Sequence, residues 1–208
     1  TPFVLEAWKE VSSSIRQKEY LGFIASLKTP AATAFLEGLA RDRNDPNRAP
    51  ALQALVERQP ALLPLAQELL SEAGPEASRG ALRETAYALL LRFGTRSALP
   101  RFEKALGDTN ETDGVVVLAY QAVNQWGDDA RRLATCLAGL REPRDARVQG
   151  ALLAFRPLVH HEVFPELCRL VRRASSQKAR LLACDSLMAY PQPEAIPYLI
   201  SALKEPYA

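Results

Sequence analysis

Histidine and cysteine are scarce in this sequence of 208 residues, which holds two His and three Cys. Cys136, Cys168 and Cys184 form no CxxC pair, and an odd count of three argues against a disulfide framework. We predict small buried thiols in a reducing compartment, which indicates a cytoplasmic protein. Because the chain starts at Thr1 rather than Met, a removed leader stays open.

Strong charge and long apolar runs are also lacking. The 26 Lys and Arg nearly balance the 24 Asp and Glu, and a net charge of +2 does not by itself indicate nucleic-acid binding. No apolar run approaches the roughly 18 residues that span a bilayer, so we expect no membrane insertion. The hydrophobic fraction of 48% and the charged fraction of 24% are ordinary for a globular protein and exclude wholesale disorder.

Sequence motifs of catalytic loops are absent: there is no Walker loop, GxGxxG or GxSxG. We therefore expect no enzyme and no cofactor. His160-His161-Glu162 is the only place where a metal or acid–base interpretation begins, and a solvated turn between helices is favoured there. Residues 108–114 resemble a calcium loop, but Ala119 stands where a bidentate Glu is required. A turn is favoured here too, so we predict no metal.

What the sequence does contain is an internal repeat. A proline is followed by apolar residues two and six positions later, for example at Pro100 and Pro165. Counting weaker copies without proline, these anchors stand at residues 2, 33, 64, 100, 131, 165 and 197, spaced by 31 to 36 residues. Proline is tolerated in the first turn of a helix, so each anchor predicts the start of a helix, here termed helix A.

A second motif follows each anchor by 15 to 19 residues and predicts a second helix, helix B. The motif begins with Arg, has a small residue three positions after it and usually has an apolar residue seven positions after it. Its copies begin at Arg48, Arg83, Arg147 and Arg180, with Val116 replacing the Arg and Gln17 fitting loosely. Because helices approach closely only where a side chain is short, we expect four small residues to be buried at helix crossings: Ala86, Ala119, Gly150 and Ala183.

The repeat resembles the HEAT-repeat superfamily, most closely the short bacterial HEAT-like repeats also found in phycobilisome lyases. The resemblance is strongest in residues 164–171, 180–187 and 195–205. It implies an all-α fold: a right-handed α-solenoid of stacked antiparallel helical hairpins, about six repeats plus a final A helix, with B helices lining the concave side. Residues 1–208 are expected to form a single repeat domain. Neither end shows a polar capping repeat, so we expect a fragment of a longer chain.

Aromatic residues recur at equivalent positions of helix B. Phe93, Trp126 and Tyr190 share one position, and Tyr87 and Tyr120 share another. Core packing is favoured over a stacking platform for bases or a ligand.

Polar residues recur at two further positions of helix B, which predicts an exposed stripe. Gln53 and Gln121 stand five residues into the helix, and Arg92, Gln125 and Arg156 stand nine residues in. These five are the candidate partner-binding residues. Ordinary solvated surface is the alternative interpretation.

The sequence therefore favours a non-catalytic scaffold that binds another protein on its helix-B surface. Arg92 and Arg156 would bind acidic or carboxylate groups of that protein. A nucleic-acid-binding module, similar to the HEAT-like DNA alkylation-repair proteins, is a less favoured alternative because the net charge is small. A bilin-lyase-like enzyme is the third hypothesis, and it rests on the repeat resemblance alone.

Overall fold

The computed structural model describes residues 7–8, 14–42, 45–55, 63–71, 78–156, 158–190 and 193–204. Within these residues there are twelve α-helices, two short 3-10 helices and no β-strand, which confirms the all-α class. The helix predicted near Pro2 lies outside the described residues.

The twelve helices alternate as the repeat predicts. The predicted B helices are α2 (Ser14–Ser26), α4 (Arg48–Leu55), α6 (Ser78–Phe93), α8 (Asp113–Trp126), α10 (Asp145–Ala154) and α12 (Gln177–Leu187). The predicted A helices are α3 (Pro30–Arg41), α5 (Leu63–Ser71), α7 (Leu99–Gly107), α9 (Asp129–Leu140), α11 (Val163–Arg173) and α13 (Ile196–Lys204). Two 3-10 helices, η3 (Arg96–Ala98) and η4 (Pro193–Ala195), precede α7 and α13.

Local sequence sets where several helices begin. The side-chain oxygens of Thr112 and Asp128 each accept a hydrogen bond from the backbone N–H three residues further along the chain, at 3.3 Å and 2.9 Å. They therefore cap α8 and α9. Thr29 caps α3 in the same way at 3.2 Å, and Pro30 follows it in the first turn. This cap explains why α3 begins before the anchor at Thr33 that the repeat indicated.

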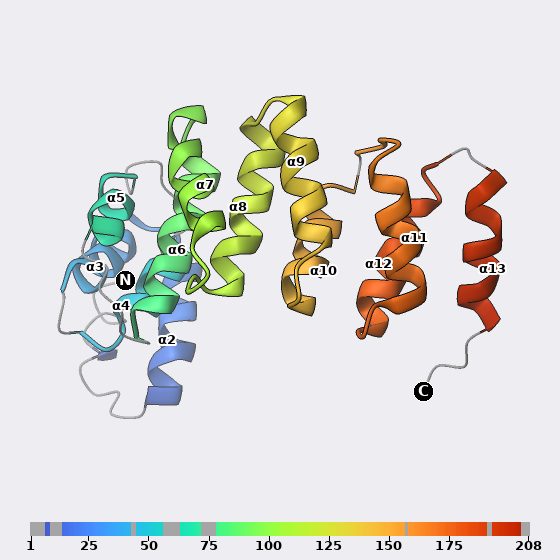
Figure 1. Cartoon of the computed structure of the whole chain (residues 1–208). Coiled ribbons are helices and arrows are strands. Elements are labelled where there is room, and N and C mark those ends of the chain that lie inside the picture. Colours follow the sequence, from blue (N-terminus) through green and yellow to red (C-terminus); the bar gives the residue numbers. More distant parts are fainter. Residues whose placement is uncertain are drawn as a thin grey trace. The chain divides into compact units, whose positions relative to one another are not determined.

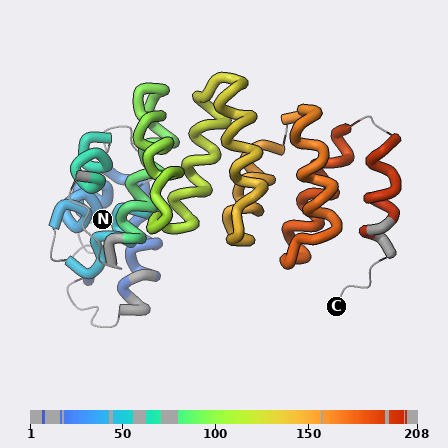
Figure 2. Tube along the Cα trace, viewed as in Figure 1, coloured from blue at the N-terminus to red at the C-terminus, as the bar shows by residue number. Residues whose placement is uncertain are grey.

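The chain divides into two compact units, Thr1–Gly94 and Thr95–Ala208. In the first unit, α4 packs against α2, α3 and α6, and α5 packs against α6. In the second unit, α8, α10 and α12 pack side by side as one layer, and α9, α11 and α13 form the other layer (Figure 1). The backbone trace of Figure 2 follows the chain from one layer to the other at each turn of the second unit.

The core of the second unit lies between its two layers. Leu140, Leu167 and Leu187 are almost fully buried there. Burying an apolar side chain of this size contributes about 1.5–3 kcal/mol, so these contacts dominate the packing energy. The interlayer core is what fixes the exposed faces described below.

Small residues lie at the helix crossings, as the sequence predicts. Ala86, Ala119 and Ala183 are fully buried, and Gly150 is buried. A Cβ atom added at Gly139 of α9 would stand 2.6 Å from the Cβ of Ala151 of α10. The two helices therefore approach closely where neither can carry a large side chain.

The recurring aromatic residues belong to the core. Tyr87, Tyr120 and Tyr190 are buried, and Phe93 and Trp126 are half-buried. The edge of one ring meets the other in the pair formed by Trp126 and Phe102, with ring centres 5.8 Å apart. The core interpretation is confirmed for the three buried tyrosines.

The predicted register of helix B is wrong by one residue in α10. The helix N-caps Thr112, Arg144 and Ser176 are evenly spaced along the sequence. Ala151, which is fully buried, keeps this spacing with Ala119 and Ala183, whereas Gly150 does not. Counted from the N-cap of each helix, the motif that begins at Arg147 starts one residue earlier than the motifs at Val116 and Arg180. Arg156 is consequently equivalent to Asn124, not to Gln125 as the sequence pattern indicated.

Candidate partner-binding face

The second unit exposes one continuous side of its layer of B helices, which we term the helix-B face. Its residues recur at spacings of three and four, so on each helix they share one side. They are exposed or half-buried: Val117, Gln121, Asn124 and Gln125 of α8, Gln149 and Leu153 of α10 with Arg156 two residues beyond its end, and Lys178, Leu181 and Asp185 of α12 with Met188, its C-cap.

Direct contacts hold the helices of this face together. Gln149 Nε2 of α10 lies 3.0 Å from the Oγ of Ser176, the N-cap of α12, and donates a hydrogen bond to it. Beyond the end of α10, a guanidinium nitrogen of Arg156 lies 3.6 Å from Oδ2 of Asp185, in the last turn of α12. A Cβ atom at Gly150 would collide with the side chain of Val117, so α8 and α10 are also in close contact. These contacts fix the positions of the three B helices relative to one another.

Apolar and polar groups alternate on the helix-B face. Leu153, Leu181 and Met188 are 51%, 48% and 65% exposed. Around them lie the exposed amides of Gln121 and Gln125. Exposed apolar side chains within a polar surround are typical of protein interfaces.

The charges on the helix-B face are few and mixed. Arg156 and Lys178 are offset in part by Asp185, with which Arg156 is paired. A nucleic-acid site would need several cations for the phosphate backbone. The two cations of this face, one of them paired, are few for contact with a phosphate backbone.

The five predicted partner-binding residues are divided between the two units. Gln121, Gln125 and Arg156 lie on the helix-B face of the second unit, and all three are exposed. Gln53 and Arg92 belong to the first unit and are also exposed.

In the first unit, Gln53 lines an open cavity of about 580 Å³ between residues of α2, α4 and α6. The other lining residues are small or apolar, apart from Thr85, and none is charged: Leu21, Gly22, Pro46, Ala49, Pro50, Ala54, Ala81 and Thr85. Arg92 lies near the end of α6, with its guanidinium carbon 5.7 Å from the ring centre of Phe93. This exposed contact leaves the charge of Arg92 accessible.

Sequence reasoning missed the apolar part of the helix-B face. Leu153, Leu181 and Met188 follow the same helical spacing as core positions, so their types alone do not separate exposed from buried. The sequence pattern also gave no indication that Arg156 pairs with Asp185. The even spacing of the N-cap residues along the sequence was the signal that could have aligned equivalent positions of the three B helices.

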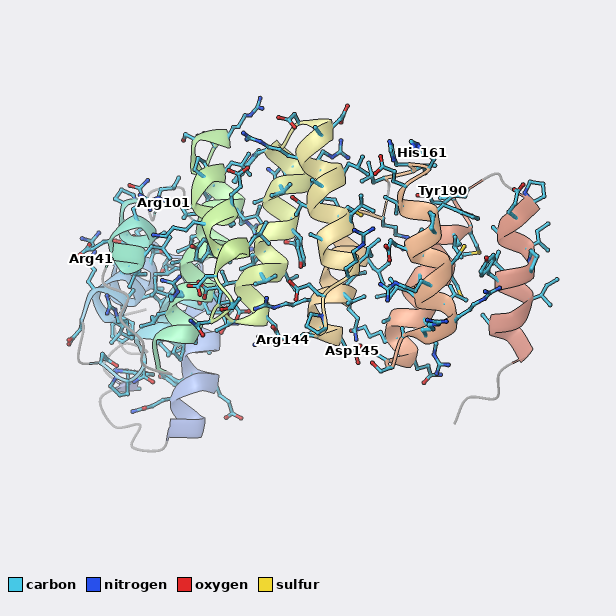
Figure 3. The ribbon with its side chains drawn as sticks, viewed as in Figure 1. Arg41, Arg101, Arg144, Asp145, His161 and Tyr190 are labelled. Carbon is cyan, nitrogen blue, oxygen red and sulfur yellow. The ribbon has the colours of Figure 1, made fainter. Side chains whose placement is uncertain are left out.

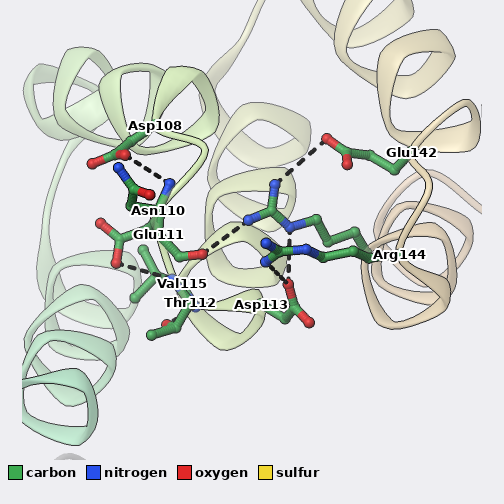
Figure 4. Close-up of polar contacts among 9 residues, drawn as sticks. Asp108, Asn110, Glu111, Thr112, Asp113, Val115, Glu142 and Arg144 are labelled. Carbon is green, nitrogen blue, oxygen red and sulfur yellow. Dashed lines mark hydrogen bonds and ion pairs between the residues drawn. The ribbon is translucent and has the colours of Figure 1, made fainter. Parts of the chain in front are cut away.

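A polar cluster joins the start of α8 to the start of α10 (Figure 4). The buried Arg147 donates from Nε to Oδ1 of Asp113 at 2.9 Å and from a terminal nitrogen to the carbonyl of Glu111 at 2.9 Å. Arg144 donates to the same Asp113 oxygen at 3.2 Å, and Glu142 lies 3.6 Å from Arg147. The hydrogen bond from Arg147 holds the pKa of the Asp113 carboxyl below its usual value.

This cluster explains the segment that resembles a calcium loop. Asp108 Oδ1 accepts a hydrogen bond from the N–H of Asn110 at 2.9 Å, and Glu111 is buried. Thr112 caps α8, and Asp113 is paired with arginines. One oxygen each of Asp108, Glu111 and Asp113 accepts a hydrogen bond from the chain, and residues 109–110 form the predicted turn.

The three cysteines are free thiols, two buried and one half-buried. Burial raises the pKa of Cys136 to about 12, and burial also raises the pKa values of Cys168 and Cys184. Thiols with raised pKa values are protonated near neutral pH.

Comparison with known proteins identifies no family: no protein-family model matches this chain, and no curated protein is significantly similar to it. In the described part of the chain, no helix has both the length and the apolar character needed to cross a membrane.

Proposed function

We propose that this chain is a HEAT-like α-solenoid whose helix-B face binds another protein. In this proposal the A and B helices form stacked antiparallel hairpins with a right-handed turn, and the B helices line the concave side. The alternation of A and B helices and the side-by-side packing of α8, α10 and α12 support it. The buried thiols fit a cytoplasmic protein.

The observation that carries the proposal is the set of exposed apolar side chains on the helix-B face. Leu153, Leu181 and Met188 are about half exposed or more, although they stand on helices whose other faces are well packed. Covering them with apolar groups of a partner would remove this surface from water, which is the main source of affinity at interface centres.

Arg156 would give the interface its orientation. Its ion pair with Asp185 is long and exposed, so most of its five N–H donors remain accessible. A guanidinium in this situation binds a carboxylate through two parallel hydrogen bonds. We therefore expect the partner to present a carboxylate beside apolar side chains. A scaffold of this kind needs no catalytic residues.

The test begins with recovery of a partner by the intact chain, followed by affinity measurements on single variants. Leu153→Ala and Leu181→Ala should each weaken binding by about 1–2 kcal/mol, close to a tenfold loss. Val159→Ala is the matched control, because Val159 is 50% exposed and lies outside the face, whereas Leu153 is 51% exposed. Full affinity in both leucine variants contradicts the proposal, and a steep loss of affinity with salt in the wild-type chain points to nucleic acid instead.

The arginines are tested by the double variant Arg92→Ala with Arg156→Ala. Because both side chains are exposed, the free energy of unfolding should change by about 0.5 kcal/mol or less. A binding role predicts lower partner affinity at this normal stability. A purely structural role predicts the reverse: a clear loss of stability, with affinity changing only as a consequence.

A further inference from the structure

Three side chains with metal-binding atoms meet in the loop between α10 and α11. His160, His161 and Glu162 each contribute one ring nitrogen or carboxylate oxygen, and these three atoms lie within 4.8 Å of one another. The ring centres of the two histidines are 4.3 Å apart, and Nδ1 of His160 is 4.0 Å from Oε1 of Glu162. Among the described residues, no other group of three such side chains gathers in this way.

The backbone under this group is held in place by Tyr190, three residues after the end of α12 (Figure 3). Its hydroxyl oxygen accepts a hydrogen bond from the N–H of His160 at 3.1 Å and donates to the carbonyl of His160 at 3.1 Å. The same carbonyl accepts the N–H of Val163, at 3.0 Å, in the first turn of α11. Tyr190 is buried, and its ring packs against Phe164 with centres 5.5 Å apart. A buried core residue therefore fixes the backbone of this loop.

The side chains themselves are free to move onto an ion. His161 and Glu162 are exposed, and His160 is half-buried. The contact that ties them locally is a long hydrogen bond of 3.3 Å from the N–H of Glu162 to Nδ1 of His160. Their lone pairs are not taken by donors from another element of the described chain.

We propose that His160, His161 and Glu162 form a binding site for a divalent transition-metal ion of the zinc class. Imidazole nitrogen and carboxylate oxygen bind Zn²⁺ at about 2.0–2.2 Å, which brings ligand atoms to roughly 3–3.5 Å from one another. Rotation of the exposed side chains about their χ angles covers the difference from the present separation. Two nitrogen ligands favour such an ion over Mg²⁺ and Ca²⁺, which prefer oxygen. At least one coordination position stays open toward solvent, for water or for a donor of another molecule.

The test is calorimetric titration of the intact chain with zinc chloride, repeated with Co²⁺ so that its absorption reports the ligands. We expect one ion per chain and at least a tenfold weaker affinity in His161→Ala and in Glu162→Gln. Both substituted side chains are exposed, so the circular dichroism spectrum should not change.

Two control variants separate this site from others. Glu194→Gln removes an exposed carboxylate outside the group, and Cys184→Ser removes the least buried thiol, a competing zinc ligand. Both should bind zinc as the wild-type chain does. The proposal is overturned if the wild-type chain binds no zinc, if excess Mg²⁺ displaces the ion, or if Cys184→Ser loses binding while His161→Ala keeps it.

Discussion

Replacement of Arg147 by alanine should destabilise the second unit by about 2–4 kcal/mol. The substitution removes the hydrogen bonds to Asp113 and to the carbonyl of Glu111, both 2.9 Å long. A hydrogen bond to a charged group contributes about 1.5–3 kcal/mol, and a buried acceptor left without a donor costs about 1–3 kcal/mol. The Asp113 side chain is 38% exposed, so water replaces part of what it loses, and the simple sum of these contributions is reduced.

Arg144→Ala is the matched control for this prediction. Arg144 donates to the same oxygen of Asp113, at 3.2 Å, but its side chain is 53% exposed. Its loss should cost about 0.5 kcal/mol or less. Urea unfolding followed by circular dichroism measures both variants. Equal destabilisation by the two substitutions would refute the reasoning, because burial of the guanidinium would then be irrelevant.

Three further predictions concern packing, acid stability and thiol reactivity. Ala183→Leu should lower stability by about 1–3 kcal/mol through overpacking, and an unchanged melting temperature would show that Ala183 is not at a helix crossing. The pKa of Asp113 is lowered in the folded state, so its contribution to stability is present above the unfolded value near 3.9 and is lost as pH falls through the folded value. Urea midpoints should therefore fall less steeply below about pH 4 in Asp113→Asn than in the wild-type chain, whereas parallel curves would contradict this. A thiol reagent at pH 8 should modify Cys184 before Cys136, whose pKa is raised to about 12, and mass spectrometry of digested protein detects the order.

The positions of the helices could be predicted because proline and small residues carry direct steric information. Pro100 stands in the first turn of α7, and Ala119 and Ala183 lie at crossings, as their types require. The register of α10 could not be predicted from the Arg motif. Arg147 stands three residues after its N-cap, whereas Val116 and Arg180 stand four residues after theirs, and its side chain hydrogen-bonds Asp113 and Glu111.

The candidate sites were predicted only in part, because exposure depends on tertiary packing. Gln121, Gln125 and Arg156 are exposed as expected, since polar side chains resist burial. Leu153 and Leu181 could not be separated from core leucines without knowing which turn of each helix meets its neighbour. His160-His161-Glu162 was visible as a run of residue types, but its support by Tyr190, 30 residues away, required the fold.

Photo-crosslinking from single positions tests the central claim most directly. A photoreactive side chain is placed at Gln125, on the helix-B face of α8, or at Ala138, which is exposed on α9 in the other layer. We predict that the partner recovered with the intact chain is crosslinked from position 125 and not from position 138. Crosslinking from position 138 alone would contradict the claim that the helix-B face holds the partner.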